Sequence, residues 1–239
     1  MIKRIAFFVE GQTEQIFLNR LVKEILGAQY TNIILKQQRG GTNAPKVEIV
    51  RNRSISIRPK YEVLISDCGS DNKVKSELID NLSNMQEKGY SMLIGLRDLY
   101  PLPLSDYEKL KKGLEYLPAY LKKDGNRFEF IVAVQEIETW FIAETHHFLK
   151  VDRKLTPRLI KEGIGYNPEA IDTQTIRHPA KDLNYIYSLV GKTYNKRHWQ
   201  VNKLVNRLDF NNIKGNIRYK LAPLDKLISI LEDVKKNGK

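Results

Sequence analysis

The chain has 239 residues and one cysteine, Cys68. A chain of this length can bury a core without disulfides or structural metals, and one cysteine excludes an internal disulfide, which favours a cytoplasmic setting. No signal-peptide pattern opens the sequence, and no apolar run approaches the roughly 20 residues that span a bilayer. We therefore expect a soluble protein with no membrane partner.

Positive charge is concentrated in the C-terminal part of the chain. The formal net charge is +12, from 40 basic and 28 acidic residues. Residues 151–239 hold 18 Lys/Arg against 9 Asp/Glu, and residues 177–220 alone hold 10 against 2. Such a region indicates a polyanionic partner, nucleic acid above all, although a merely solvated basic face remains the alternative.

The apolar pattern predicts alternating strands and helices. Residues 3–9 form a short apolar run typical of a buried parallel strand, Gly11 interrupts it, and helical spacing begins near Thr13. We expect further strands at residues 32–36, 61–66, 91–96 and 128–134, with helices at 73–88, at 105–123 and from 136 onward. This order predicts an α/β domain over residues 1–150, with a mostly parallel sheet covered by helices on both faces.

The pattern changes beyond residue 150. Helices are expected at residues 179–190, 198–208 and 222–236, so residues 151–239 are predicted to be a helical basic extension packed on the first domain. The segment Arg39-Gly40-Gly41-Thr42 is expected to be a flexible loop, with a turn that approaches a phosphate as the alternative, and His146-His147 a solvated helix end rather than a ligand pair. No GxxxxGK[ST] loop, zinc-type cysteine spacing or GxSxG elbow is present in the sequence.

Acidic residues follow several of the predicted strands. Glu10, Asp67, Asp98 and Glu136 each come just after a strand, and the carboxyl ends of parallel strands meet at one edge of a sheet. Carboxylates gathered there repel one another unless a cation lies among them, and oxygen ligands suit Mg²⁺ or Mn²⁺. The candidate metal ligands are Glu10, Glu14, Asp98, Glu136 and Glu138. Each has a structural alternative as a helix cap or turn residue.

Four segments together resemble a known family. They are VEGQTE at 9–14, RDLYP at 97–101, QEIETWFIAE at 135–144 and HPAKDLNYIYSLVGKTYNK at 178–196. They are similar to the stand-alone bacterial Toprim-like proteins and to the Toprim nuclease domain of overcoming-lysogenization-defect (OLD) proteins, over residues 1–200. The resemblance implies a Mg²⁺- or Mn²⁺-dependent nuclease in phage defence, a nucleic-acid substrate and a partner ATPase.

The resemblance also assigns roles to single residues. Glu10 takes the position of the Glu after the first strand, Glu14 is its companion, and Asp98 takes the first position of an Asp-x-Asp pair. Tyr100 stands where the second Asp belongs. A tyrosine cannot replace a carboxylate as a metal ligand at neutral pH. Either Glu136 or Glu138 replaces that carboxylate, which gives Glu10, Asp98 and Glu136 as the catalytic set, or the site is degraded and the protein is a non-catalytic nucleic-acid-binding or ATPase-partner subunit.

Basic and aromatic residues alternate near the C-terminal end of the resemblance. Lysine and arginine can contact phosphates while aromatic rings stack on bases. The aromatic candidates are Tyr185, Tyr187, Tyr194 and Trp199, which are core residues of amphipathic helices in the alternative interpretation. The predicted nucleic-acid-binding residues are Lys181, Lys192, Lys196, Arg197 and Lys203.

Overall fold

The computed structural model describes residues 2–41, 44–118, 121 and 127–237. They fall into two compact units: unit 1 is Met1–Arg97, Ser105–Val132 and Ser229–Lys239, and unit 2 is Asp98–Leu104 and Ala133–Ile228. The boundary expected at residue 150 lies inside unit 2, because residues 133–150 group with the helices that follow them. The C-terminal residues from 229 onward return to unit 1.

Unit 1 is built on a mostly parallel sheet. Its described residues form six strands in the order β3-β2-β4-β1-β5-β6. Strand β1 pairs in parallel with β4 and β5, β4 also pairs in parallel with β2, and β3 is antiparallel to β2. The strands are β1 (Lys3–Val9), β2 (Thr31–Gly41), β3 (Ala44–Ser54), β4 (Tyr61–Asp67), β5 (Tyr90–Asp98) and β6 (Arg127–Ala133).

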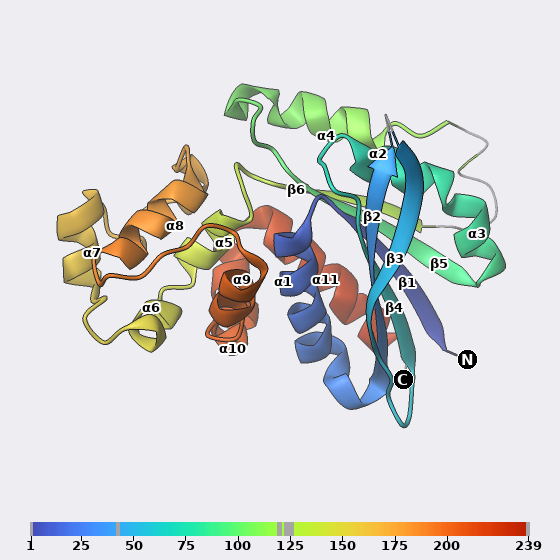
Figure 1. Cartoon of the computed structure of the whole chain (residues 1–239), viewed down its shortest axis with the longest axis horizontal. Coiled ribbons are helices and arrows are strands. Elements are labelled where there is room, and N and C mark those ends of the chain that lie inside the picture. Colours follow the sequence, from blue (N-terminus) through green and yellow to red (C-terminus); the bar gives the residue numbers. More distant parts are fainter. Residues whose placement is uncertain (1, 42–43, 119–120, 122–126, 238–239) are drawn as a thin grey trace. The chain divides into compact units, whose positions relative to one another are not determined.

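Helices cover both faces of this sheet (Figure 1). The chain moves from β1 to β2 in one direction and from β4 to β5 in the other, so right-handed crossovers place the connecting helices on opposite faces. Ile5 to Val9 are therefore buried on both sides of β1, which explains the continuous apolar run. The helices between the strands are α1 (Gln12–Val22), α2 (Lys73–Asp80), α3 (Leu82–Glu87) and α4 (Tyr107–Glu115).

The β2–β3 hairpin departs from the prediction for residues 39–42. Strand β2 extends to Gly41, and β3 continues the sheet as an antiparallel edge, while residues 42 and 43 lie outside the described residues. Val47 and Val50 of β3 are 50% and 43% exposed. An exposed edge strand buries no apolar face, so its sequence lacks the pattern from which a strand is recognised.

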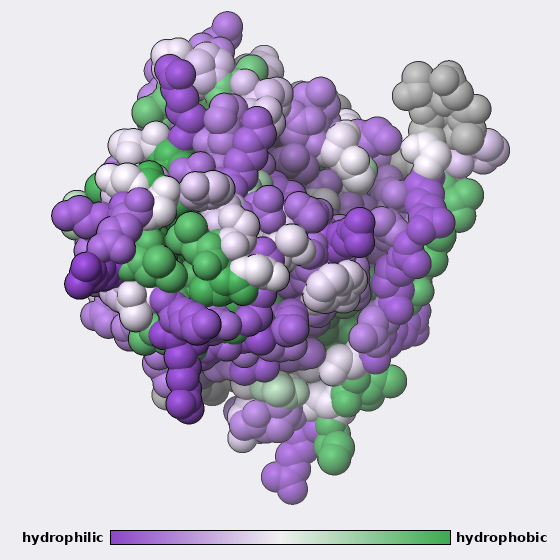
Figure 2. All heavy atoms as spheres, turned by 60° about the vertical axis from the view of Figure 1, so that its left-hand side comes forward, coloured by the Kyte–Doolittle hydropathy of each residue, from purple (hydrophilic) through white to green (hydrophobic). Residues whose placement is uncertain are grey.

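Unit 2 is helical, as expected for the C-terminal region, and the α/β class with a mostly parallel sheet is confirmed. Among the residues described, no helix is both long and apolar enough to cross a lipid bilayer. The face drawn in Figure 2 is largely hydrophilic, and apolar residues gather on it in limited areas. The remaining helices are α5 (Glu138–Ala143), α6 (His146–Val151), α7 (Pro157–Ile164), α8 (Pro179–Ser188), α9 (His198–Val205), α10 (Phe210–Gly215) and α11 (Ala222–Lys236), the last of which runs from unit 2 into unit 1.

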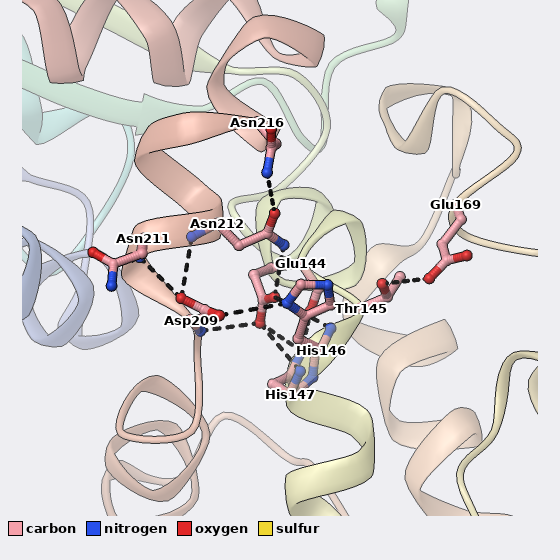
Figure 3. Close-up of polar contacts among 9 residues, drawn as sticks. All are labelled: Glu144, Thr145, His146, His147, Glu169, Asp209, Asn211, Asn212 and Asn216. Carbon is pink, nitrogen blue, oxygen red and sulfur yellow. Dashed lines mark hydrogen bonds and ion pairs between the residues drawn. The ribbon is translucent and has the colours of Figure 1, made fainter.

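A buried carboxylate joins two short helices of unit 2 (Figure 3). Glu144 is fully buried and accepts hydrogen bonds from the backbone N–H groups of His146 and His147 at the start of α6. It also accepts from the backbone N–H of Asp209 and the side-chain amide of Asn212, at the start of α10. His147 is buried as well, so the expectation of a solvated His146-His147 pair is wrong for His147, whose ring packs against Phe148.

A glycine in unit 1 tests the packing of the sheet. A Cβ at Gly95 of β5 would lie 2.6 Å from the ring of Phe130, whereas a Cβ at Gly113 of α4 meets nothing within 4 Å. We expect Gly95→Ala to lower the free energy of unfolding by about 1–3 kcal/mol, because the core must shift. Gly113→Ala is the control and should raise it by about 0.5–1 kcal/mol. Urea unfolding that gives both variants the same change would contradict this packing.

The Glu144 contacts predict a pH dependence. Burial raises the pKa of Glu144, but the hydrogen bonds from His147, Asn212 and Asp209 together hold it below the ordinary value of 4.5. A depressed folded-state pKa contributes stability that is present above 4.5 and is lost as the pH falls through the folded pKa. Glu144→Gln should therefore cost about 1–3 kcal/mol at pH 7. The difference from wild type should shrink below pH 4.5 in urea unfolding, and a pH-independent difference would contradict it.

Candidate metal centre

Three carboxylates converge in unit 2. Ligand oxygens of Asp98, Glu136 and Glu138 all lie within 4.8 Å of one another. Asp98 is the last residue of β5, Glu136 follows β6, and Glu138 is the first residue of α5. The cluster thus forms where two chain segments leave strands, which is the kind of place that the sequence indicated.

Backbone hydrogen bonds hold the two acidic segments together. The N–H of Leu99 donates to the carbonyl of Ala133 at 2.9 Å, and the N–H of Tyr100 donates to the carbonyl of Gln135 at 2.8 Å. Asp98 Oδ1 accepts a hydrogen bond of 3.0 Å from the N–H of Ile137. One oxygen of Asp98 therefore orients the carboxylate by accepting from the segment that carries both glutamates.

A lysine from a third segment supplies positive charge. Lys196 Nζ lies 2.7 Å from Glu136 Oε1 and 3.1 Å from Glu138 Oε2. Burial lowers the pKa of Lys196, but Glu138, Glu136 and Asp98 outweigh it and raise that pKa above its ordinary value. The lysine side chain thus stays charged and offsets part of the repulsion among the carboxylates.

The backbone is unusual at two positions beside the cluster. Gln135 and Lys196 have φ values of 63° and 52°, in the left-handed region that residues other than glycine seldom adopt. Such conformations persist where surrounding contacts fix them, and they are concentrated at functional sites. Here Gln135 directly precedes Glu136, and Lys196 carries the ammonium that contacts Glu136.

Glu138 is the most buried member of the cluster. Its side chain is fully buried, and Glu138 Oε1 accepts a hydrogen bond of 2.7 Å from the Tyr194 hydroxyl. Burial raises the pKa of Glu138, the Lys196 ammonium opposes that shift, and Glu136 adds to it. Glu138 Oε2 lies 3.1 Å from Lys196 Nζ, and the hydrogen bond from Lys196 also opposes the rise in the pKa of Glu138.

The donor set fits a hard divalent cation. Mg²⁺ and Mn²⁺ take oxygen ligands, and Mg²⁺ sites in proteins use a few carboxylates and complete the shell with water or substrate oxygens. Glu136 Oε2 accepts from the N–H of Ala180, so Glu136 is oriented through both oxygens. Asp98, Glu136 and Glu138 could therefore hold a metal ion between them.

Glu10 and Glu14 belong to unit 1. Glu10 follows β1 and donates its backbone N–H to Leu96 of the neighbouring β5. Glu14 is buried and accepts a hydrogen bond of 3.0 Å from the N–H of Gly11, which is the helix-capping role of the structural alternative. Because Asp98 lies in unit 2, the participation of Glu10 in the metal site stays a prediction.

Tyr100, which stands at the position of the second Asp of the Asp-x-Asp pair, does not take the place of that carboxylate in the acidic cluster. Its side chain is 43% exposed, and its ring meets His178 edge to face at 6.1 Å between centroids. The structure brings both Glu136 and Glu138 to Asp98, which leaves the cluster with three carboxylates without an aspartate at position 100.

The predicted nucleic-acid-binding residues separate into different environments. Lys196 is part of the acidic cluster, and Lys192 forms an ion pair of 2.8 Å with Asp152. The exposed members of the set are Lys181, Arg197 and Lys203. The sequence does not predict the role of Tyr194. In the sequence, Tyr194 is one of several aromatic candidates for base stacking, and no local sequence pattern indicates its hydrogen bond to Glu138.

The chain belongs to the DUF4276 family, described as a domain of unknown function, whose family model matches residues 9–213. The match spans both units and includes the complete acidic cluster together with Lys196. No curated protein and no solved structure gives a significant match to the chain.

Removal of the internal ammonium tests the electrostatics of the cluster. Lys196→Met keeps the length of the side chain and leaves Glu136 and Glu138 without their cation. We expect a loss of about 1–3 kcal/mol in unfolding free energy, less than for a fully buried pair, because Lys196 is 36% exposed. Lys161→Met, an exposed change of the same charge on α7, should stay within about 0.5 kcal/mol. If urea unfolding gave both variants the same loss in unfolding free energy, Lys196 would not stabilise the acidic cluster.

Proposed function

We propose that the chain is a Mg²⁺- or Mn²⁺-dependent nuclease, a hydrolase of phosphodiester bonds in DNA or RNA. The observation that carries this proposal is the convergence of Asp98, Glu136 and Glu138, three carboxylates that come from two separate chain segments. Electrostatic repulsion among such carboxylates destabilises the fold unless a cation is bound. The same arrangement suits the metal-assisted chemistry that phosphodiester hydrolysis needs. The resemblance to Toprim nuclease domains supports the same reaction.

The residues of the cluster divide the work. Asp98, Glu136 and Glu138 would hold the metal, and Glu10 is proposed as a further ligand. A bound Mg²⁺ or Mn²⁺ would lower the pKa of a coordinated water and neutralise charge on the phosphoryl oxygens. Lys196 keeps an ammonium at 2.7 Å from Glu136 and can donate to a phosphate oxygen that comes close to the carboxylates. Tyr194 orients Glu138 through its hydroxyl.

The wider setting of the proposal comes from the resemblance and from charge. Ten basic against two acidic residues over 177–220 favour a polyanionic substrate. The similarity to OLD-type nucleases supports a role in bacterial phage defence beside a partner ATPase, in the cytoplasm.

A second function is favoured by the position of Lys196. Its ammonium already lies between Glu136 and Glu138, so the cluster has a cation without metal. In that case the carboxylates and Lys196 form a structural network, and the chain is a non-catalytic subunit that binds nucleic acid or the ATPase.

Asp98→Asn distinguishes the two functions. The amide keeps an oxygen that can accept from Ile137 but removes the negative charge. For wild type we expect saturating Mn²⁺ to raise the melting temperature by about 5–10 °C, as mass action requires for tight binding. Asp98→Asn should lose most of this shift and reduce metal-dependent cleavage of single- and double-stranded nucleic acids at least about a hundredfold. Glu162→Gln, an exposed change on α7, should behave as wild type.

Two results of this experiment would count against the nuclease. A wild type with neither a Mn²⁺-induced shift nor cleavage would leave the binding subunit as the function of the chain. An Asp98→Asn variant that cleaves as well as wild type would place any activity at another site. The same assays with Glu10→Gln decide whether Glu10 contributes, and we expect it to lose cleavage because a ligand loses its charge.

A further inference from the structure

Unit 2 contains a second chemically distinct feature, a pocket of about 250 Å³ beside α9. Pockets for drug-sized ligands span roughly 300–1,000 Å³, so this one suits a smaller group such as a single planar ring system. Its walls come from the end of α6, from the end of α8 and the turn that follows, and from α9 and the residues just after it. The residues that matter for its chemistry are Tyr187, Lys192, Thr193, Trp199, Lys203 and Arg207.

The pocket combines an open aromatic ring with positive charge. The chain has two tryptophans; Trp140 is buried, whereas Trp199 is 58% exposed at the pocket. Lys203 and Arg207 have no ion pair within the described part of the chain, in contrast to Lys192, which is held by Asp152. An exposed tryptophan beside two uncompensated cations matches a ligand that has both an aromatic ring and a phosphate.

A buried hydroxyl at the pocket lacks a partner. Tyr187 is 5% exposed, and its hydroxyl has no hydrogen-bond partner among the described residues. Burial raises the pKa of Tyr187 and nearby Arg207 opposes the shift, so the phenol is neutral at physiological pH and can donate or accept. Native proteins leave few such groups unsatisfied, which points to a polar atom supplied by a ligand.

The pocket is linked to the acidic cluster by a contact between two tyrosines and by one short chain segment. The Tyr187 ring contacts the Tyr194 ring edge to face at 6.2 Å, and the Tyr194 hydroxyl bonds to Glu138. Gln200 of α9 donates its amide to the carbonyl of Thr193 and accepts from the N–H of Asn195. One short segment, residues 192–196, therefore forms a wall of the pocket and delivers Tyr194 and Lys196 to the carboxylates.

We propose that this pocket binds one unpaired base of a nucleic-acid strand, with the base stacked on Trp199 and its phosphate contacting Lys203 and Arg207. This inference rests on the proposed function and deepens it, since a base held here places the strand beside Asp98, Glu136 and Glu138. It also selects the substrate class: a base must be unstacked to enter, so single-stranded nucleic acid is preferred over duplex.

Trp199 variants test the stacking contact. Binding of a dye-labelled oligothymidylate and its RNA counterpart is measured by fluorescence anisotropy in EDTA, so that no metal-dependent step enters. Trp199→Leu should weaken binding about five- to hundredfold, the range for loss of one stacked base, while Trp199→Phe keeps an aromatic ring and most of the affinity. Tyr219→Leu is the control, because Tyr219 is 72% exposed in unit 2 and lies outside the pocket.

Lys203 tests the phosphate contact independently. Lys203→Ala should reduce the slope of log affinity against log salt by about 0.7, the value for one phosphate contact on a single strand. Lys161→Ala removes the same charge from an exposed position on α7 and should leave the slope unchanged. Thermal melts confirm that each variant is folded before binding is measured.

Three results would overturn the inference. They are wild-type protein that does not bind the oligonucleotides, Trp199→Leu that binds as tightly as Tyr219→Leu, and Trp199-dependent binding of AMP that oligonucleotides do not compete for. The last result would make the pocket a site for free nucleotides. Because binding is read without metal, a cleavage-inactive wild type that still shows Trp199-dependent strand binding would refute the nuclease and leave the pocket intact.

Discussion

The arrangement of unit 2 depends on the mutual repulsion of three carboxylates. Two unit charges separated by 4.8 Å interact by about 3–4 kcal/mol at the effective dielectric of a protein near its surface. Asp98, Glu136 and Glu138 form three such pairs, so the cluster is unstable without a nearby positive charge. Lys196 supplies that charge, at 2.7 Å from Glu136 and 3.1 Å from Glu138. The segment from 192 to 197 therefore does more than connect two helices, because it places the ammonium that offsets the repulsion among the carboxylates.

Backbone hydrogen bonds accompany the grouping of residues 98–104 with the helices rather than with the sheet. Asp98 ends β5, and from there the backbone of Leu99 and Tyr100 is hydrogen-bonded to Ala133 and Gln135. These bonds fix the spacing between Asp98 and the segment that carries Glu136 and Glu138. The left-handed backbone at Gln135 turns the chain from β6 toward α5 within a few residues. A cluster assembled from short, rigid segments keeps its geometry better than one placed on long loops.

Sequence patterns predicted those features of the protein that depend on neighbouring residues. The apolar run of β1 and the acidic residues at the end of β5 and after β6 could be recognised, because burial on two faces and position near a strand end affect consecutive residues. The ion pair between Lys196 and Glu136 could not be predicted from the sequence, because 60 residues separate the partners and no periodicity links them. His147 was misplaced for a similar reason: α6 has six residues, and the ring of its second histidine contacts not only Phe148 but also Tyr187, which lies far along the chain. The antiparallel β3 was missed because it is an exposed edge.

The turn at residues 192–196 links the pocket to the acidic cluster in a way that restricts both. Thr193 belongs to the pocket wall, and Gln200 clamps this turn through Thr193 and Asn195. The left-handed backbone of Lys196 fixes the direction in which the ammonium leaves the turn. A shift of the wall would therefore move the positive charge that Glu136 and Glu138 require, whereas Trp199 extends from α9 outside the clamp. It follows that a displacement of the turn must change the electrostatic balance of the carboxylates, so the pocket wall and the acidic cluster depend on one another.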